Sequence, residues 1–481
     1  MAGMAFTLAA ALREISTISR HDRTFLLITS GTSMCSNNRS PSRYDGLEED
    51  EIRVLFLEPG SLQEPLMGEL GTAAITPDAF DRQRPSKPCS SVRYEAVSYA
   101  WESLDLPRRI YVRNIGAIAI TASLFDILSH LRYVHRCRRL WVDGICIDQA
   151  DVSERNHQVA KMADIFSAST TVLVWLGAEE NTDSLALATI GLCKEMDSTV
   201  SGNDFGDDSG NKSGKDSLYD KIDLQTLRDT LCQYAGPYAA FRSSIGSQED
   251  VAITALKSVS AIFQAKWFER LWVVQETNGL RDVVCFRGYR AIANSDLAGA
   301  FVLLNNFAPM MRSHGIQVDR QALLDAMELM SRGFQQPGNG GDIMSQFLRY
   351  SDRRCRDPRD RVYALRQTLG LERFDELRPD YQLDYVEVFR RLICVCLNLG
   401  KSRPNMTTGF IHPTLALALV GTEVKPRSNP NSPSWVPCLH ELTSAAKAKL
   451  RLYGKRCSTG DYVGAGSPDD VWLAHGELLE A

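Results

Sequence analysis

The chain has 481 residues, with 54 Lys and Arg against 59 Asp and Glu and a formal net charge of −5. Hydrophobic residues make up 44% and charged residues 23%, the balance of a soluble globular protein, and at roughly 150 residues per domain the length predicts two or three domains. These figures argue against a nucleic-acid-binding protein driven by bulk positive charge and against a wholly disordered chain.

The 12 cysteines are scattered and form no CxxC pair. We therefore expect reduced, mostly buried thiols of a cytoplasmic protein, with neither a disulfide framework nor a zinc site. Because no run of 18 apolar residues occurs, no membrane-spanning segment is expected.

Residues 1–44 are polar towards their end and are expected to form a flexible lead-in. Strands are predicted at 52–60 and 92–101, a hairpin at 108–121, and an amphipathic helix at 123–134 from apolar residues spaced i, i+3, i+4, i+7.

The segment 139–177 predicts a strand, a helix and a second strand. LWVDGICI (140–147) is predicted to be a buried strand that runs into a loop, and TTVLVWLG (170–177) to be a continuous apolar strand. Asp151 is a candidate N-cap for the helix between them. A βαβ unit of this kind implies a parallel sheet with helices on its faces.

The Gly, Ser and Asp-rich stretch 197–219 predicts a disordered insertion. A long helical pattern then continues into 266–279, followed by a strand at 281–290. Residues 291–481 are expected to be mostly helical, with a helix from Asp357 to Leu369 and a Pro-rich segment at 421–437. Domain boundaries are therefore placed at 45–290 and 291–481.

Common catalytic signatures are absent from the sequence. GNKSGKDS (210–217) lacks the spacing of a Walker loop, and no GxGxxG, HExxH or GxSxG occurs. No metal or resident cofactor is therefore expected.

Three blocks together resemble the fungal heterokaryon incompatibility (HET) domain family. They are YEAVSYAW (94–101), LWVDGICIDQ (140–149) and the run from Trp267 to Glu276, and DPRDRVYAL (357–365), RPDY (378–381) and PSWVP (433–437) resemble the region that follows this domain in many members. One departure is Glu102, where the family usually has Gly.

The resemblance implies a flavodoxin-like, Toll/interleukin-receptor-like (TIR-like) parallel sheet with flanking helices. It implies an effector of fungal self/non-self recognition and programmed cell death, with self-association or an incompatibility protein as partner. The charge balance and the lack of a long apolar run predict no nucleic-acid or membrane partner. Many TIR domains cleave NAD with the Glu of a WxxxE pattern, which Trp272 to Glu276 matches. Glu276 is thus the candidate catalytic residue and NAD a possible substrate.

The residues themselves point to a binding site at the strand ends. In an open parallel sheet, ligands bind beyond the carboxyl ends of the strands, where Asp143, Asp148 and Gln149 follow LWV. Arg155 at the start of the next helix is a plausible phosphate contact. Tyr99 and Trp101, at the end of another strand, are candidate pocket walls.

Structural interpretations stay open for each of these residues. Asp143 and Asp148 could satisfy loop N–H groups, Arg155 could pair with Glu154 or Asp151, and Glu276 could be a capping or buried structural acid. Three functions follow: an incompatibility effector, an NAD glycohydrolase acting through Glu276, or a non-enzymatic self-assembling interaction module.

Overall fold

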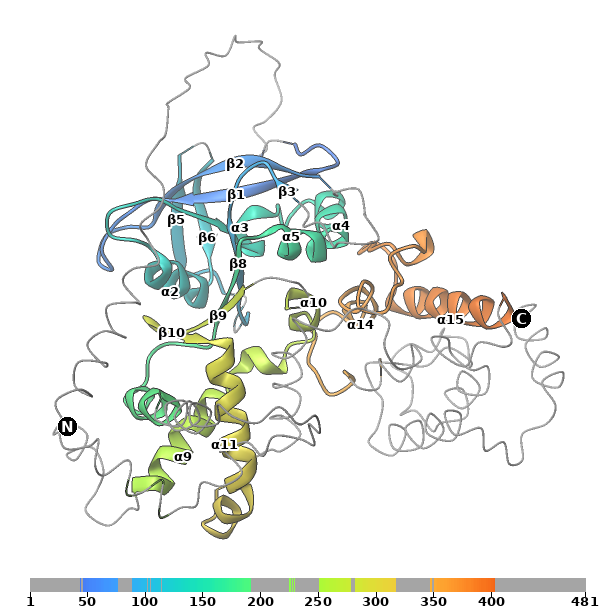
Figure 1. Ribbon diagram of the computed structural model, residues 1–481. Coiled ribbons are helices and arrows are strands. Elements are labelled where there is room, and N and C mark those ends of the chain that lie inside the picture. Colours follow the sequence, from blue (N-terminus) through green and yellow to red (C-terminus); the bar gives the residue numbers. More distant parts are fainter. Residues whose placement is uncertain are drawn as a thin grey trace, which may run out of the picture. The chain divides into compact units, whose positions relative to one another are not determined.

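The computed structural model describes residues 44–76, 89–191, 251–277, 282–316 and 350–402, except positions 45, 102, 104 and 114, together with the isolated positions 225, 227, 229 and 347. Figure 1 shows the arrangement of the elements. The expected insertion 197–219, the Pro-rich segment 421–437, most of the lead-in and Glu102 lie outside these residues.

The described part of the chain forms a mixed α/β structure around one sheet. Nine strands form a continuous path in the order β10-β9-β8-β4-β7-β1-β2-β5-β6, and β3 pairs with β2. The strands are β1 (Glu51–Leu57), β2 (Met67–Thr76), β3 (Cys89–Ser90), β4 (Glu95–Ser98), β5 (Arg108–Val112), β6 (Gly116–Ile120), β7 (Arg138–Trp141), β8 (Thr171–Trp175), β9 (Asp282–Arg287) and β10 (Arg290–Ala293).

Four neighbouring strands, β9, β8, β4 and β7, run parallel to one another. The expected βαβ unit is confirmed, since β7 and β8 are parallel, although β4 lies between them. Following the chain, β4 is the first of the four, β7 lies on one side of it and β8 and β9 lie on the other. The connections between the parallel strands therefore change direction at β4. Of the other strand pairs, only β2 with β5 is parallel, and the rest are antiparallel.

The helices lie mainly between the strands and after them. They are α2 (Ala122–Leu131), α3 (Asp143–Cys146), α4 (Val152–Ala160), α5 (Met162–Ala168), α9 (Val251–Ile262), the 3₁₀ turn η2 (Lys266–Glu269), α10 (Val273–Glu276), α11 (Asn294–Ser313), α14 (Asp360–Tyr363), the 3₁₀ turn η4 (Asp375–Leu377) and α15 (Tyr385–Ser402). Asp151 caps α4 as expected, because its carboxylate accepts from the N–H groups of Ser153 and Glu154.

Two helices expected from the sequence are wrong in extent. The pattern that continues through 266–279 ends as a helix at Ile262 and is replaced by η2, an extended residue and the single turn α10. Similarly, the helix expected from Asp357 to Leu369 contains only the four α-helical residues of α14. The segments 266–279 and 357–369 pack against each other, for example through Trp272 and Asp360. These tertiary contacts override the helical periodicity of the sequence.

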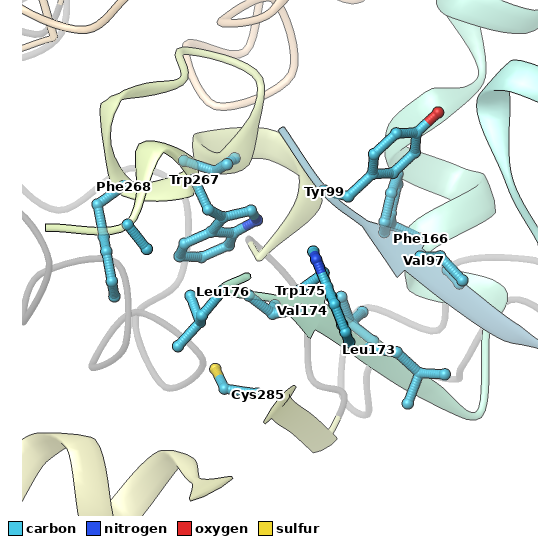
Figure 2. Close-up of a cluster of buried hydrophobic side chains, with 14 of the residues drawn as sticks. Val97, Tyr99, Phe166, Leu173, Val174, Trp175, Leu176, Trp267, Phe268 and Cys285 are labelled. Atoms are coloured by element: carbon cyan, nitrogen blue, oxygen red, sulfur yellow. The ribbon is translucent and has the colours of Figure 1, made fainter. Parts of the chain in front are cut away.

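Large aromatic side chains fill the interior beside the parallel strands. Trp141 and Trp267 are each 1% exposed, and the Trp267 ring packs edge-on against Phe268 with 5.1 Å between centroids. Figure 2 shows Trp267 in the same buried cluster as Tyr99, Trp175 and Leu176. Burial of each such side chain contributes roughly 2–3 kcal/mol, so this cluster fixes the chain near the ends of β4 and β8.

Five cysteines among the described residues, Cys137, Cys146, Cys285, Cys355 and Cys394, are free thiols. Cys146 and Cys285 are buried, and burial raises the pKa of each thiol to about 12. Cys355 and Cys394 are partly buried, and Cys137 is exposed. No helix among the described residues is long and apolar enough to cross a membrane.

Candidate functional site

The last residue of β4, Ser98, is the centre of a buried polar network. Its hydroxyl donates to Oε2 of Glu276 and accepts from the indole N–H of Trp267 at 2.6 Å. Ser98 and Glu276 are 1% and 3% exposed. The network thus joins the carboxyl end of a parallel strand to the segment that carries the WxxxE pattern.

Arg270 forms a bidentate ion pair with Glu276. Its Nη1 and Nη2 atoms lie 3.0 Å from Oε2 and Oε1 respectively, and the two side chains are 18% and 2% exposed. No basic residue lies at helical spacing from Glu276, so this ion pair was not predicted from the sequence. Because the chain bends between Glu269 and Trp272, a residue six positions earlier reaches the carboxylate.

Asp143 lies just beyond β7, close enough to Arg270 and Glu276 to interact with both electrostatically. Its Oδ2 accepts from the indole N–H of Trp101 at 3.2 Å, and its Oδ1 accepts from the N–H of Gly144 at 2.7 Å. Burial raises the pKa of Asp143 to about 6, and the charge of Glu276 adds to that increase, while Arg270 opposes it.

Tyr99 and Trp101 form an aromatic wall next to Asp143. Their rings stack with 6.1 Å between centroids, and Tyr99 is 3% exposed while Trp101 is 40% exposed. Burial, and then the hydrogen bond and charge of Asp143, raise the pKa of Tyr99 well above its usual value. A Cβ at Gly144 would lie 2.8 Å from the Tyr99 hydroxyl, so glycine permits this close approach.

Two of the other predicted site residues serve the loop itself. Asp148 accepts from the N–H of Ala150 at 3.0 Å, and the amide of Gln149 donates to the carbonyl of Asp143 at 2.8 Å. These bonds match the interpretation of Asp148 as a loop residue, and they place Gln149 at the edge of the Asp143 site.

Arg155 is directed towards a different part of the chain. Its guanidinium lies over the ring of Tyr381, 4.3 Å from the centroid. Glu154, a partner of Arg155 predicted from the sequence, instead forms an ion pair with Arg53 and accepts from the N–H of Asp148. The structure therefore brings Asp143, Tyr99, Trp101 and Glu276 together around Arg270, whereas Arg155 contacts the segment after the domain.

Sequence reasoning did not identify Ser98, Arg270 or the indole N–H of Trp267 as members of the site. Ser98, Trp267 and Arg270 all occur in the blocks that carry the family resemblance, so their presence there was an available signal. No group of three metal-ligating side chains occurs among the described residues.

Comparison with known proteins places these blocks in one family. The family model described as heterokaryon incompatibility protein (HET) matches residues 94–276. Residues 94–276 are therefore similar to the HET domain. The match begins at Tyr94, just before β4, and ends at Glu276, so it contains every residue of the network around Arg270.

A curated relative supports the same assignment. The chain is 28% identical over 258 residues to heterokaryon incompatibility protein 6, OR allele, of Neurospora crassa, an alignment that covers 50% of this chain and 34% of the relative. The chain thus spans about a third of the length of that relative. No solved structure was found to match the chain. The sheet extends beyond the HET match on both sides, through β1 to β3 before it and β9 and β10 after it.

Proposed function

We propose that this heterokaryon-incompatibility-type protein is an effector of fungal self/non-self recognition that triggers programmed cell death in the cytoplasm. The observation that carries the proposal is the HET match over 94–276, within which Ser98, Arg270 and Glu276 form one buried network at the end of β4. An incompatibility partner protein or self-association would supply the trigger.

Expression in a fungal host tests this proposal. The full chain, fused to an inducible multimerisation domain, is expected to arrest growth on induction. The E276Q variant at the same folded level is expected to lose the arrest, whereas E58Q, which alters an exposed pair with Arg113, is expected to keep it. Absence of any growth defect in the induced wild type would overturn the proposal.

The strand order favours a more specific fold and chemistry. The order β7-β4-β8-β9 corresponds to 2-1-3-4 along the chain, which is the order of the first four strands of flavodoxin-like sheets. We propose that this part of the sheet is flavodoxin-like and TIR-like. Ligands of such sheets bind beyond the carboxyl ends at the strand where the connections change direction, and that strand here is β4.

A second candidate function is NAD hydrolysis at this edge of the sheet. Its support is the placement of Glu276 and Asp143 around Arg270 beside the end of β4. In the reaction the bond between ribose C1′ and the nicotinamide nitrogen breaks, nicotinamide leaves with the bonding pair, and water adds to C1′ and releases a proton. A carboxylate would stabilise the cationic ribosyl centre.

Nicotinamide release by the purified full chain tests this chemistry. We expect release from NAD that is lost in E276Q and retained in E58Q. Growth arrest that survives in both E276Q and D143N, together with no nicotinamide release, would favour the non-enzymatic self-assembling module instead.

A further inference from the structure

The segment from Phe268 to Glu276 has little regular structure of its own. It contains an extended residue, Arg270, and the four-residue turn α10. A helix this short is not stable in isolation. The contacts that other parts of the chain make with the segment must therefore set the positions of Arg270 and Glu276.

The first such contact is a main-chain bridge on both sides of Arg270. The N–H of Leu271 donates to the carbonyl of Arg354 at 2.8 Å, and the N–H of Arg354 donates to the carbonyl of Glu269 at 2.5 Å. The guanidinium of Arg353 also donates to the carbonyl of Phe268 at 2.5 Å. The backbone that presents Arg270 is thus paired with residues 353 and 354.

The second contact holds the turn that ends in Glu276. The indole N–H of Trp272 donates to Oδ2 of Asp360 at 3.1 Å, and the carbonyl of Trp272 accepts from the N–H of Glu276 at 3.1 Å. With its nitrogen facing Ala364, the side-chain amide of Gln275 donates to the carbonyl oxygen of Ala364 at 3.1 Å. Asp360 is the first residue of α14, and Ala364 follows its last residue. Figure 1 labels this helix.

Asp360 is itself held in place from the opposite side. It is 8% exposed, and the hydroxyl of Tyr381 donates to its Oδ1 at 2.6 Å. The Tyr381 ring lies against the guanidinium groups of Arg155 and Arg359, 4.3 and 5.1 Å from the ring centroid. The segments DPRDRVYAL (357–365) and RPDY (378–381) therefore contact each other, and both contact the HET domain at this place.

We propose that Asp360 is a positioning residue, which fixes Glu276 through the indole of Trp272, and that residues 350–381 complete the functional unit although they follow the HET match. For its activity readout this inference rests on the function proposed above. The physical claim does not. Asp360 orients Trp272, Trp272 is the N-cap residue of α10, and α10 carries Glu276 to Ser98 and Arg270.

Three variants of Asp360 and its partner Trp272 show whether Asp360 acts by orienting the Trp272 indole or by its charge. D360N removes the charge but keeps an oxygen for the Trp272 N–H and an amide N–H for the Tyr381 oxygen. D360L leaves the indole N–H without its acceptor, and W272F removes the donor. E387Q, which alters an ion pair with Arg390 and Arg391 on α15, is the matched control.

The indole N–H resonances of the full chain, labelled with ¹⁵N-tryptophan, provide the readout. The N–H of Trp267 bonds to Ser98 and therefore reports on the position of Glu276. We expect D360L and W272F to move the Trp267 resonance away from its wild-type position. In D360N the resonance should stay close to that position, and in E387Q it should not move. Nicotinamide release and growth arrest should follow the same order.

Two outcomes would overturn the inference. One is a Trp267 resonance unmoved in folded D360L and W272F. The other is an equal displacement in D360N and D360L, because the role of Asp360 would then be its charge. Failure of the proposed function gives a different result: no variant and no wild type would show activity, while the Trp267 shifts would still separate D360L from D360N.

Discussion

Glu276 and Asp143 are two carboxylates near one guanidinium, and their surroundings differ. Glu276 is 2% exposed at its side chain and receives both arms of Arg270 and the hydroxyl of Ser98. Asp143 is partly exposed, and its hydrogen-bond donors are the indole of Trp101, the hydroxyl of Tyr99 and the N–H of Gly144. The first carboxylate has a direct cationic partner, whereas these three donors to the second are neutral.

This difference assigns the two groups different physical roles. Glu276 joins the end of β4 to the segment after η2, so its removal should affect folding. Asp143 has a raised pKa of about 6 and lies beside a half-exposed tryptophan, so it can change its protonation state near neutral pH. Four variants test the comparison, beginning with the largest expected effect.

Substitution of Glu276 by alanine should be the most destabilising. It leaves Arg270 without its partner and Ser98 without its acceptor, and breaking a buried pair costs about 3 kcal/mol. Urea unfolding measures the loss. The exposed pair of Glu58 with Arg113 supplies the control, for which E58A should cost less than about 1 kcal/mol. Equal losses in the two variants would contradict the role of Glu276.

Removal of the Ser98 hydroxyl should have the next largest effect. S98A leaves the buried indole N–H of Trp267 without its acceptor, at a cost of about 2 kcal/mol in the free energy of unfolding. S103A removes an exposed hydroxyl that bonds to Asp105 and is expected to change stability by less than about 0.5 kcal/mol. The comparison fails if the two alanine variants have the same stability.

Replacement of Asp143 by asparagine should have an effect that depends on pH. The folded-state pKa of about 6 is above the ordinary value of 3.8, so the folded chain holds this proton more tightly and its contribution to stability falls as pH rises from about 4 to above 6. The free energy of unfolding of D143N, relative to that of the wild type, should therefore rise by about 2 kcal/mol between pH 4 and pH 8. Urea unfolding at the two pH values gives the difference, and a difference independent of pH would refute it.

The smallest effect is expected at Trp101. Because its side chain is 40% exposed and bonds to Asp143 at its edge, W101F should change the free energy of unfolding by less than about 0.5 kcal/mol. A loss as large as that of S98A would mean that the Asp143 side of the site is also part of the folded core. Thermal denaturation of the two variants side by side is sufficient to decide.

The sequence predicted the parts of the fold that depend on local pattern. Continuous apolar runs indicated β7 and β8, and Asp151 indicated the start of α4. It also placed Asp143 and Glu276 among the candidate residues. It could not predict the pair of Arg270 with Glu276, because that pair requires the helical pattern to stop at Ile262.

The contacts that stop this helix come from distant residues. Arg354 pairs with the backbone on both sides of Arg270, and Asp360 binds the indole of Trp272 from 88 positions away. Hydrophobic periodicity describes neighbours along one element, so it carries no information on such pairings. The same limit explains Arg155, whose ring partner Tyr381 lies far along the chain.

A double-mutant cycle between Arg270 and Glu276 tests the central claim most directly. Unfolding free energies of the wild type, R270Q, E276Q and the double variant give the coupling energy between the two side chains. We expect a favourable coupling of about 2 kcal/mol, typical of charge-assisted hydrogen bonds in a buried pair. A coupling indistinguishable from zero would contradict a Glu276 that is held by Arg270 at the end of β4.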